Sequence, residues 1–322
     1  MDKSGNPTPF PNWTPRGIIP AVLLPFNTDL GIDEAAFRDH LRDVISVDGI
    51  TAITLNCHST EVHACTLDEQ KRVLEIGMEE AADRLPVVSG VYTDSSVEAA
   101  RIARIATEGG ASALLVFPPH TLAVGGHLRP EMAIEHFRRI ADASDLPIIL
   151  FNYPMTSNVG YPFETLLAIF EAVPSVRAIK DWCNDPPLHE RQIRTFQNLP
   201  RPVNVLSTHS AWLMSSLVMG CEGALSGAGS VIAALQVELF RAIQNNDLAA
   251  AKNVNDRIYP VAQVFYGPPF LDMHNRMKEL LVLQGKIPCA AVRPPLSKLP
   301  QQEINRIEKA AREAGILVSR KK

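Results

Sequence analysis

Short apolar runs alternate with amphipathic stretches from residue 17 onward, and this alternation limits the possible folds more than any other feature. Runs such as LPIILF at 146–151 are apolar on both faces, which is typical of parallel strands covered by helices. The stretches between them carry apolar residues at positions i, i+3 and i+4, as helices do. Eight such units in about 215 residues predict a (β/α)8 TIM barrel. The strand-like runs are 17–26, 49–56, 86–92, 111–118, 146–153, 176–181, 203–207 and 222–227.

The ends of the expected helices support this pattern. The helical stretches are 32–47, 66–84, 95–109 and 129–143. Thr66 and Glu69 have the spacing of a capping box, and the pair Gly109 and Gly110 is typical of a helix end. An open, doubly wound sheet remains an alternative, but the turn after the first run lacks the glycine pattern of such folds.

Beyond the eighth run, helical patterns continue to the end of the chain, at 231–246, 247–265, 270–285 and 300–315. We therefore expect three parts. They are an N-terminal extension (1–16), the barrel with its active site (17–230) and a C-terminal helical domain (231–322).

Composition indicates a soluble protein that acts on a small molecule. The formal net charge is -4 and the basic residues are scattered among acidic ones, which favours neither nucleic acid nor an anionic membrane surface. No apolar run approaches the roughly 20 residues needed to span a bilayer, and the N-terminal stretch does not read as a signal peptide. Five cysteines without CxxC spacing argue against a disulfide framework and a structural zinc site, and predict a cytoplasmic location.

Lys180 is the only one of the ten lysines that falls in a predicted barrel strand. An ammonium group in such a strand must be paired, must have its pKa lowered by desolvation, or must react. A neutral lysine is the nucleophile of Schiff-base chemistry with keto compounds. The strand alone leaves a second interpretation open, in which Lys180 forms a structural ion pair with Asp181 or Glu61.

Active sites of (β/α)8 barrels lie at the carboxyl ends of the strands. Polar and aromatic residues gather at these positions, where we expect them to converge. They are Asn56, His58, Glu61, Tyr92, His120, Phe151, Asn152, Tyr153, Lys180, Trp182, Ser207, His209, Ser226 and Gly227.

Four segments carry a family resemblance: GIIPAVLLPF at 17–26, AIKD at 178–181, GCEG at 220–223 and VRPPL at 292–296. In order and spacing they resemble the dihydrodipicolinate synthase and N-acetylneuraminate lyase superfamily of class I aldolases, over roughly residues 15–315. The resemblance implies a (β/α)8 barrel with a C-terminal helical domain. It also implies Lys180 as the Schiff-base lysine, and a homo-oligomer, either a tetramer built as a dimer of dimers or a dimer.

The chain departs from the family pattern at several positions. The family's Gly-Thr-Thr-Gly-Glu segment is replaced by CHSTE at 57–61, so that His58 stands in place of the proton-relay threonine. Phe151 replaces the strand-5 tyrosine that acts as acid and base, and phenylalanine has no transferable proton. The arginine that binds a substrate carboxylate has no counterpart in 155–160, and His120 lies near the place of the aromatic residue contributed across the subunit interface. These departures argue against an authentic dihydrodipicolinate synthase.

Two residues are candidates to replace the missing relay. Tyr153 shares the parity of Phe151 and should point to the same side, about 7 Å nearer the mouth of the barrel. It could equally line the rim or pack on Trp182. His58 offers an imidazole suited to general acid and base steps.

The remaining candidates are assigned to substrate binding. Ser59 and Thr60, with the backbone amides of their loop, are the expected carboxylate ligands, and Glu61 either contacts substrate or bonds backbone amides. The loop at 226–230 either accepts an anion at a helix N-terminus or serves packing. The substrate-binding set is Ser59, Thr60, Glu61, His120, Asn152, His209, Ser226 and Gly227.

These observations predict a Schiff-base-forming lyase, an aldolase or dehydratase, that acts on a 2-keto acid or sugar acid through Lys180 without metal or organic cofactor. Tyr153 and His58 complete the predicted catalytic set. One alternative is a keto-acid-binding barrel that has lost its proton relay and is not an enzyme. Another is a metal-dependent barrel hydrolase that uses His58, His120, His209 and Asp181 as ligands.

Overall fold

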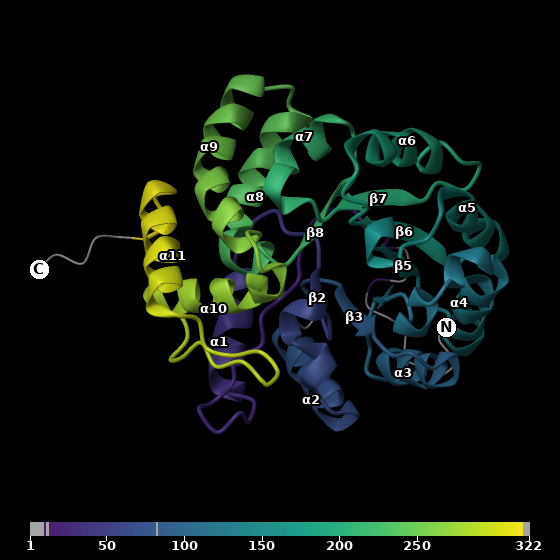
Figure 1. Cartoon of the computed structure of the whole chain (residues 1–322), viewed down its shortest axis with the longest axis horizontal. Helices are drawn as coiled ribbons and strands as arrows, with labels where there is room; N and C mark the ends of the chain where they lie inside the picture. Colours follow the sequence, from purple (N-terminus) through teal and green to yellow (C-terminus); the bar gives the residue numbers. More distant parts are fainter. Residues whose placement is uncertain (1–9, 11–12, 82, 318–322) are drawn as a thin grey trace, which may run out of the picture.

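Eight parallel strands form the centre of the molecule (Figure 1). The computed structural model describes residues 10, 13–81 and 83–317, so most of the expected N-terminal extension lies outside the described residues. All eight predicted strands are confirmed; β6 matches its apolar run, and the other seven are shorter than theirs. They are β1 Gly17–Pro20, β2 Ile53–Leu55, β3 Val87–Val91, β4 Ala113–Val116, β5 Ile148–Asn152, β6 Val176–Asp181, β7 Asn204–Ser207 and β8 Gly223–Ser226.

The sheet curls into a nearly closed barrel. Neighbouring strands pair in chain order from β2 to β8, and β1 pairs with β8 in parallel register. Isolated parallel bridges, Ile18 to Ile50 and Ala21 to Thr54, join the two remaining edges. The predicted (β/α)8 fold is therefore confirmed, and the open-sheet alternative is wrong.

Strand residues divide into two apolar layers because successive side chains point to opposite faces of the sheet. On β5, Ile148 belongs to the layer between strands and helices, and Ile149 belongs to the layer inside the barrel. Phe151 and Tyr153 both belong to the inner layer, which confirms the predicted parity of these two side chains.

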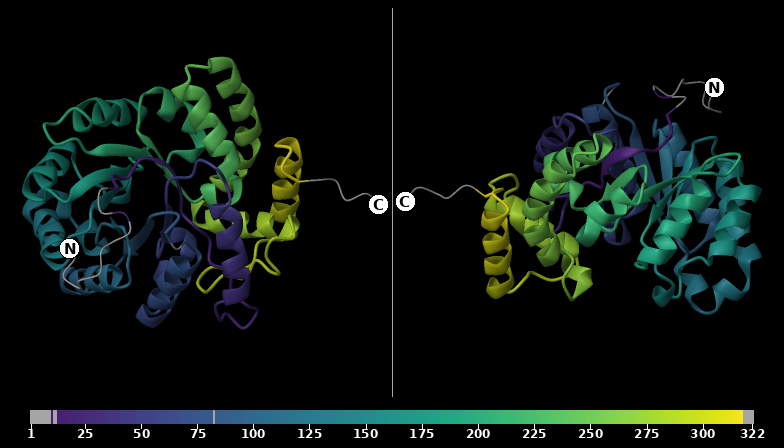
Figure 2. Two further views of the ribbon diagram at one scale, coloured as in Figure 1. Left: turned by 180° about the vertical axis from the view of Figure 1, so that it is seen from behind. Right: turned by 90° about the horizontal axis from the view of Figure 1, so that it is seen from above.

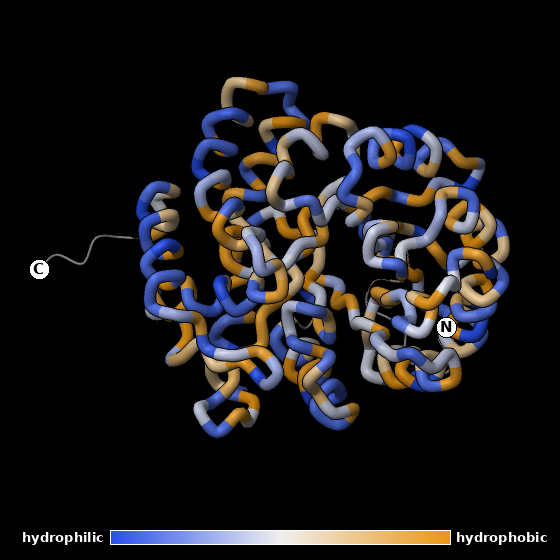
Figure 3. The backbone as a smooth tube through the Cα atoms, viewed as in Figure 1, coloured by the Kyte–Doolittle hydropathy of each residue, from blue (hydrophilic) through white to orange (hydrophobic). Residues whose placement is uncertain are grey.

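Helices follow each strand and surround the barrel (Figure 2). Hydrophilic and hydrophobic residues alternate along their turns, so each helix buries one side (Figure 3). The predicted capping box is confirmed, since the Thr66 N–H donates to Glu69 Oε2 (2.8 Å) and the Glu69 N–H donates to Thr66 Oγ1 (3.2 Å). The barrel helices are α1 Glu34–Ile45, α2 Leu67–Ala81, α3 Ser96–Glu108, α4 Pro130–Ala143, α5 Phe163–Ala172, α6 Pro186–Phe196, α7 Leu213–Val218 and α8 Gly229–Gln244.

Three further helices form the C-terminal extension on one side of the barrel (Figures 1 and 2). They are α9 Leu248–Phe265, α10 Met273–Leu283 and α11 Gln301–Glu313. The preceding helix α8 packs on β1 and so takes the place of the eighth barrel helix. We therefore propose that the extension starts after α8, about fifteen residues beyond the boundary expected at 230. None of the helices in the described part of the chain is both long and apolar enough to cross a membrane.

Candidate active site

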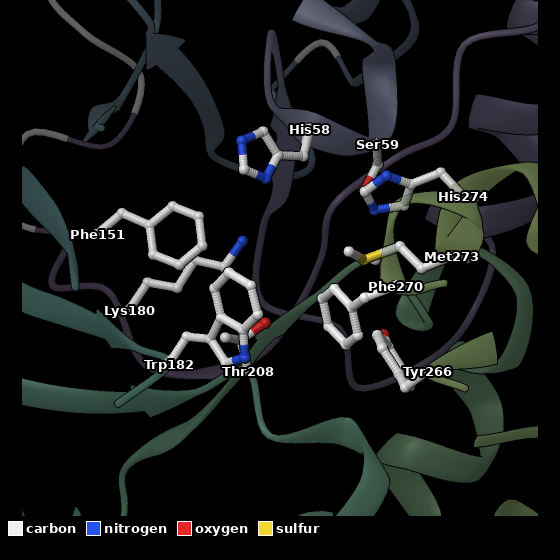
Figure 4. A pocket seen from close by; sticks show the side chains of 11 residues that line it. His58, Ser59, Phe151, Lys180, Trp182, Thr208, Tyr266, Phe270, Met273 and His274 are labelled. Carbon is white, nitrogen blue, oxygen red and sulfur yellow. The ribbon is translucent and has the colours of Figure 1, made fainter. Parts of the chain in front are cut away.

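A pocket lies at the carboxyl ends of the strands, between the barrel and the C-terminal extension (Figure 4). It encloses about 390 Å³ of space, including the part open to solvent. One wall comes from the barrel strands and their loops, and the other comes from the segment between α9 and the start of α10. The lining residues are His58, Ser59, Phe151, Lys180, Trp182, Thr208, Gly227, Tyr266, Phe270, Met273 and His274.

Lys180 extends from β6 into this pocket and is only 5% exposed (Figure 4). Its Nζ lies 4.1 Å from the centroid of the Phe151 ring. Among the described residues, no carboxylate forms an ion pair with this amine. Burial therefore lowers the pKa of Lys180 from 10.5 to about 8, which raises the fraction of neutral, nucleophilic amine near pH 7.

The two proposed partners of Lys180 bind other groups. Asp181 points to the opposite side of β6 and contacts His189 Nδ1 at 2.6 Å. Glu61 contacts the buried Lys278 Nζ at 2.5 Å and accepts a hydrogen bond from the Arg293 N–H (3.0 Å). The interpretation of Lys180 as a structural ion pair with either carboxylate is therefore wrong.

The loop 57–61 presents one hydroxyl to the pocket and turns the other inward. Ser59 Oγ lies 3.2 Å from His274 Nε2, and both side chains line the cavity. Thr60 Oγ1 accepts from the Cys57 N–H (2.7 Å) and donates to the Cys57 carbonyl (2.8 Å), so this hydroxyl is used within its own loop. Burial lowers the pKa of His274 to about 3, which keeps its imidazole neutral at physiological pH.

Gly227 leaves the space that these groups occupy. A Cβ atom at this position would lie 2.9 Å from both Ser59 Oγ and His274 Nε2. Its neighbour Ser226 is fully buried, with its Oγ 2.5 Å from Ser210 Oγ and 3.4 Å from the Tyr266 hydroxyl. Gly227 therefore faces the pocket, and Ser226 supports Tyr266 from behind.

Tyr153 and His58, the two relay candidates, contact each other. The Tyr153 hydroxyl lies 2.9 Å from His58 Nε2. Burial raises the pKa of the phenol, while burial and then the nearby Lys180 charge hold the pKa of His58 well below its ordinary value. Both groups are therefore neutral, and the phenol donates to Nε2 when the imidazole carries its proton on Nδ1. Tyr153 also packs on Trp182, with ring centroids 5.3 Å apart. The predicted packing role and the predicted relay role are therefore compatible with each other.

Besides Tyr153, Thr60, Glu61 and Ser226, three other candidates lie away from the pocket lining. His120 stands exposed at the rim, with its Nε2 3.4 Å from the Tyr92 hydroxyl. Asn152 donates to Asp181 Oδ1 (3.1 Å) and accepts from the Tyr161 N–H (3.3 Å), because it points outward from β5. His209 is buried near Asp181, where its Nε2 accepts from the Asn184 N–H (3.1 Å). Neither Asn152 nor His209 offers its polar atoms to the pocket.

The metal-hydrolase alternative does not fit this geometry. Within the described ranges, one group of histidine, cysteine and carboxylate side chains is close enough to share a metal ion. It contains Asp181 and His209 but neither His58 nor His120. The proposed set of four ligands therefore does not converge.

Sequence reasoning missed the second wall of the pocket. Tyr266, Phe270, Met273 and His274 come from the end of α9, the 3-10 turn Phe270–Asp272 and the start of α10. Phe270 stacks on Trp182 with ring centroids 5.0 Å apart, so it joins the two walls. The glycine and prolines at 267–269 interrupt the helical pattern and could have indicated a functional loop.

A barrel whose sixth strand carries a buried lysine without an ion pair to any described carboxylate has the architecture of a Schiff-base lyase. The chain matches the dihydrodipicolinate synthetase family over residues 14–314. A 4-hydroxy-tetrahydrodipicolinate synthase from Acidobacterium capsulatum is 30% identical, with 92% of this chain and 95% of the relative covered.

Solved structures share the fold. A prophage protein of the dihydrodipicolinic acid synthase family from E. coli K12, in complex with pyruvate, has a TM-score of 0.85 at 22% identity and covers 94% of this chain and 99% of its own. CdNal from Clostridium difficile, in complex with mannosamine, has a TM-score of 0.82 at 21% identity and covers 93% and 99%. The chain therefore belongs to the dihydrodipicolinate synthetase family, whose members are class I lyases.

Proposed function

We propose that this protein is a lyase, an aldolase or dehydratase, that forms an imine between Lys180 and a 2-keto acid. The observation that carries the proposal is the buried Lys180 amine, which faces the pocket, has no carboxylate partner among the described residues and has a pKa lowered to about 8. An amine in this state attacks a ketone and loses water to give a protonated imine. The imine then accepts the electron pair of the bond that breaks at the neighbouring carbons.

The proton steps are assigned to Tyr153 and His58. In an aldol cleavage, the substrate hydroxyl gives its proton to the Tyr153 oxygen while the phenol passes its own proton to His58 Nε2, 2.9 Å away. The carbon–carbon bond breaks to release an aldehyde, and the electron pair remains as an enamine on Lys180. Reprotonation and hydrolysis of this enamine release the smaller keto acid and restore the amine.

The lining favours a substrate with a single carboxylate and an apolar or aromatic tail. Ser59 and the neutral His274 offer hydrogen bonds at one side of the cavity. Phe151, Trp182 and Phe270 form a largely aromatic remainder, and the lining residues include no arginine. A second carboxylate, as in the dihydrodipicolinate synthase reaction, would have no cationic partner there, which supports a different substrate.

Borohydride trapping tests the proposal. We expect incubation with pyruvate, or with a longer 2-keto acid, followed by reduction to add a stable adduct at Lys180 in a peptide map. Lys278 is the matched control, because it is equally buried but paired with Glu61, and it should carry none. An adduct elsewhere, or no adduct with any 2-keto acid, contradicts the proposal.

Turnover distinguishes the lyase from a binding protein. The loss of the strand-5 tyrosine at Phe151 favours the alternative of a keto-acid-binding barrel without a relay. Imine formation without turnover across a panel of keto acids and sugar acids would support that alternative. We also expect pyruvate with aspartate semialdehyde to give little turnover in a coupled assay, and turnover like that of a working synthase would contradict the assigned substrate class.

The assembly and location are further parts of the proposal. The family resemblance supports a homo-oligomer, a tetramer or a dimer, although one related structure is described as a monomeric dihydrodipicolinate synthase variant. Light scattering on the purified protein would decide between these states. The five free cysteines support a reducing cytoplasm as the location.

A further inference from the structure

Four side chains with metal-ligating atoms converge behind the wall of the active site. Asp181 ends β6, Cys183 follows it, His189 lies on α6 and His209 follows β7. One ligand atom from each residue lies within 4.8 Å of all the others, and all four residues are buried. The group is separate from the pocket, because Lys180 and Trp182 line the pocket while Asp181 and Cys183 alternate to the opposite side.

Three contacts between these atoms, from 2.6 to 3.9 Å, bracket the spacing in a tetrahedral zinc site. Metal–ligand bonds of 2.0–2.3 Å place ligand atoms about 3.3–3.6 Å apart. Cys183 Sγ lies 3.2 Å from Asp181 Oδ2 and 3.9 Å from His209 Nε2, on either side of this range. The 2.6 Å contact between His189 Nδ1 and Asp181 Oδ2 would have to open by about 0.7 Å.

The outer atoms of two of the four ligands, His189 and Asp181, are held by hydrogen bonds, as in known metal sites. His189 Nε2 lies 2.6 Å from Ser216 Oγ, so its proton can donate there while Nδ1 binds a metal. Asn152 donates to Asp181 Oδ1, and the Gln192 amide donates to Oδ2 (2.8 Å), which has a second lone pair for a metal. The lone pair of His209 Nε2 accepts the Asn184 N–H, a hydrogen bond that a metal at Nε2 would replace, and the buried Nδ1 has no partner among the described residues.

The charge and the ligand types of the four side chains favour a divalent transition-metal ion such as zinc. A carboxylate, a thiolate and two neutral imidazoles carry a charge of about -2, which one divalent cation neutralises in a buried place. Mixed nitrogen and sulfur ligands favour zinc over magnesium or calcium, which take oxygen ligands. Binding would release the Cys183 thiol proton to solvent and remove the proton from His189 Nδ1.

Although the spacing of the cysteines argues against a structural zinc site, we propose that Asp181, Cys183, His189 and His209 form one, which fixes the end of β6. Four protein ligands leave no open position for a substrate, so the ion would act through structure and not through the reaction. It would join β6, α6 and the loop after β7, and so hold the strand that carries Lys180 and Trp182. The zinc site and the imine chemistry can be tested separately, because the four metal ligands take no part in imine formation and Lys180 binds no metal.

Metal content of the wild-type protein is the first test. Protein produced with zinc in the medium should contain one zinc per chain, and chelator-treated protein should take up one equivalent and melt at a higher temperature when zinc is added. Cobalt in place of zinc should give the charge-transfer absorption of a metal thiolate. Substoichiometric zinc together with no uptake by the chelated protein would overturn the proposal.

Variants locate the ion. Loss of an outer-shell partner alone weakens metal binding about 10- to 100-fold, so Cys183→Ser and His209→Gln should each weaken zinc binding by at least this much. Cys183→Ser should also abolish the absorption band of the metal thiolate. Cys289→Ser and His136→Gln are the matched controls, with one cysteine and one buried histidine changed away from the cluster, and should bind zinc like the wild type. Unchanged affinity in folded Cys183→Ser and His209→Gln would overturn the site. If these two variants do not fold, the zinc count and cobalt spectrum of the wild type still decide the proposal.

Discussion

Replacing Lys180 by methionine should stabilise the protein at neutral pH. Methionine has nearly the same length, and it places an apolar group beside Phe151 and Trp182 where the wild type buries an amine without an ion pair to any described carboxylate. Burial of this amine lowers the free energy of unfolding of the wild-type chain, and the proposed imine formation depends on the same buried amine. Removing the amine removes the cost.

The pKa of Lys180 sets the magnitude. Its fall from 10.5 to about 8 on folding corresponds to about 3 kcal/mol, caused by burial. The unfolded chain holds the proton more tightly, so the cost is full below pH 8, shrinks as the pH rises toward 10.5, and is absent above that value. We therefore expect Lys180→Met to exceed the wild type in free energy of unfolding by about 3 kcal/mol at pH 7 and by about 2 kcal/mol at pH 9.

Urea unfolding at pH 7 and pH 9 measures both values, with Lys278→Met as the matched control. Lys278 is also fully buried, but its partner Glu61 would be left as an unpaired buried carboxylate. Loss of one member of a buried pair typically costs about 3–5 kcal/mol, so this variant should be less stable than the wild type. The reasoning fails if Lys180→Met is the less stable protein at pH 7, or if its advantage does not narrow at pH 9.

Three further predictions concern the reaction. The rate of imine trapping at Lys180 should rise from pH 6 and level off above about pH 8, because the neutral amine is the nucleophile, and a flat profile from pH 6 to 9 would contradict the lowered pKa. Tyr153→Phe should retain folding and trapping while turnover falls at least about tenfold, or about 1.4 kcal/mol of barrier, whereas full turnover would assign the proton step to another group. Gly227→Ala, which would place a methyl group 2.9 Å from two pocket side chains, should weaken keto-acid binding at least about tenfold (about 1.4 kcal/mol), and binding equal to the wild type would show that the substrate lies elsewhere.

The fold was predictable because local patterns determine it. Eight runs apolar on both faces, separated by helical periodicity, have few alternatives to a barrel. Alternation along a strand also predicts that Phe151 and Tyr153 share a face. The same rule places Asn152 on the other face, where it serves Asp181, and it could have excluded this residue from the substrate set.

The second wall of the pocket could not be read from these patterns. Tyr266 and His274 are more than 80 positions from Lys180, and only the docking of the extension brings them to the strand ends. The same holds for Lys278, which periodicity places on a helix but which a buried contact with Glu61 draws toward the barrel. Contacts of this kind depend on how two elements pack, and a single sequence carries no periodic signal for that.

The division of the pocket between two stretches of chain separates reactivity from selectivity. The amine and its proposed relay lie on β5, β6 and the loop after β2, while the segment 266–274 supplies much of the surface that a substrate tail would meet. Exchange of this short segment between related barrels could therefore change which substrate tail is bound best, while the reactivity of the Lys180 amine stays the same. New specificities could arise in such a scaffold by changes far along the chain from the residue that makes the covalent bond.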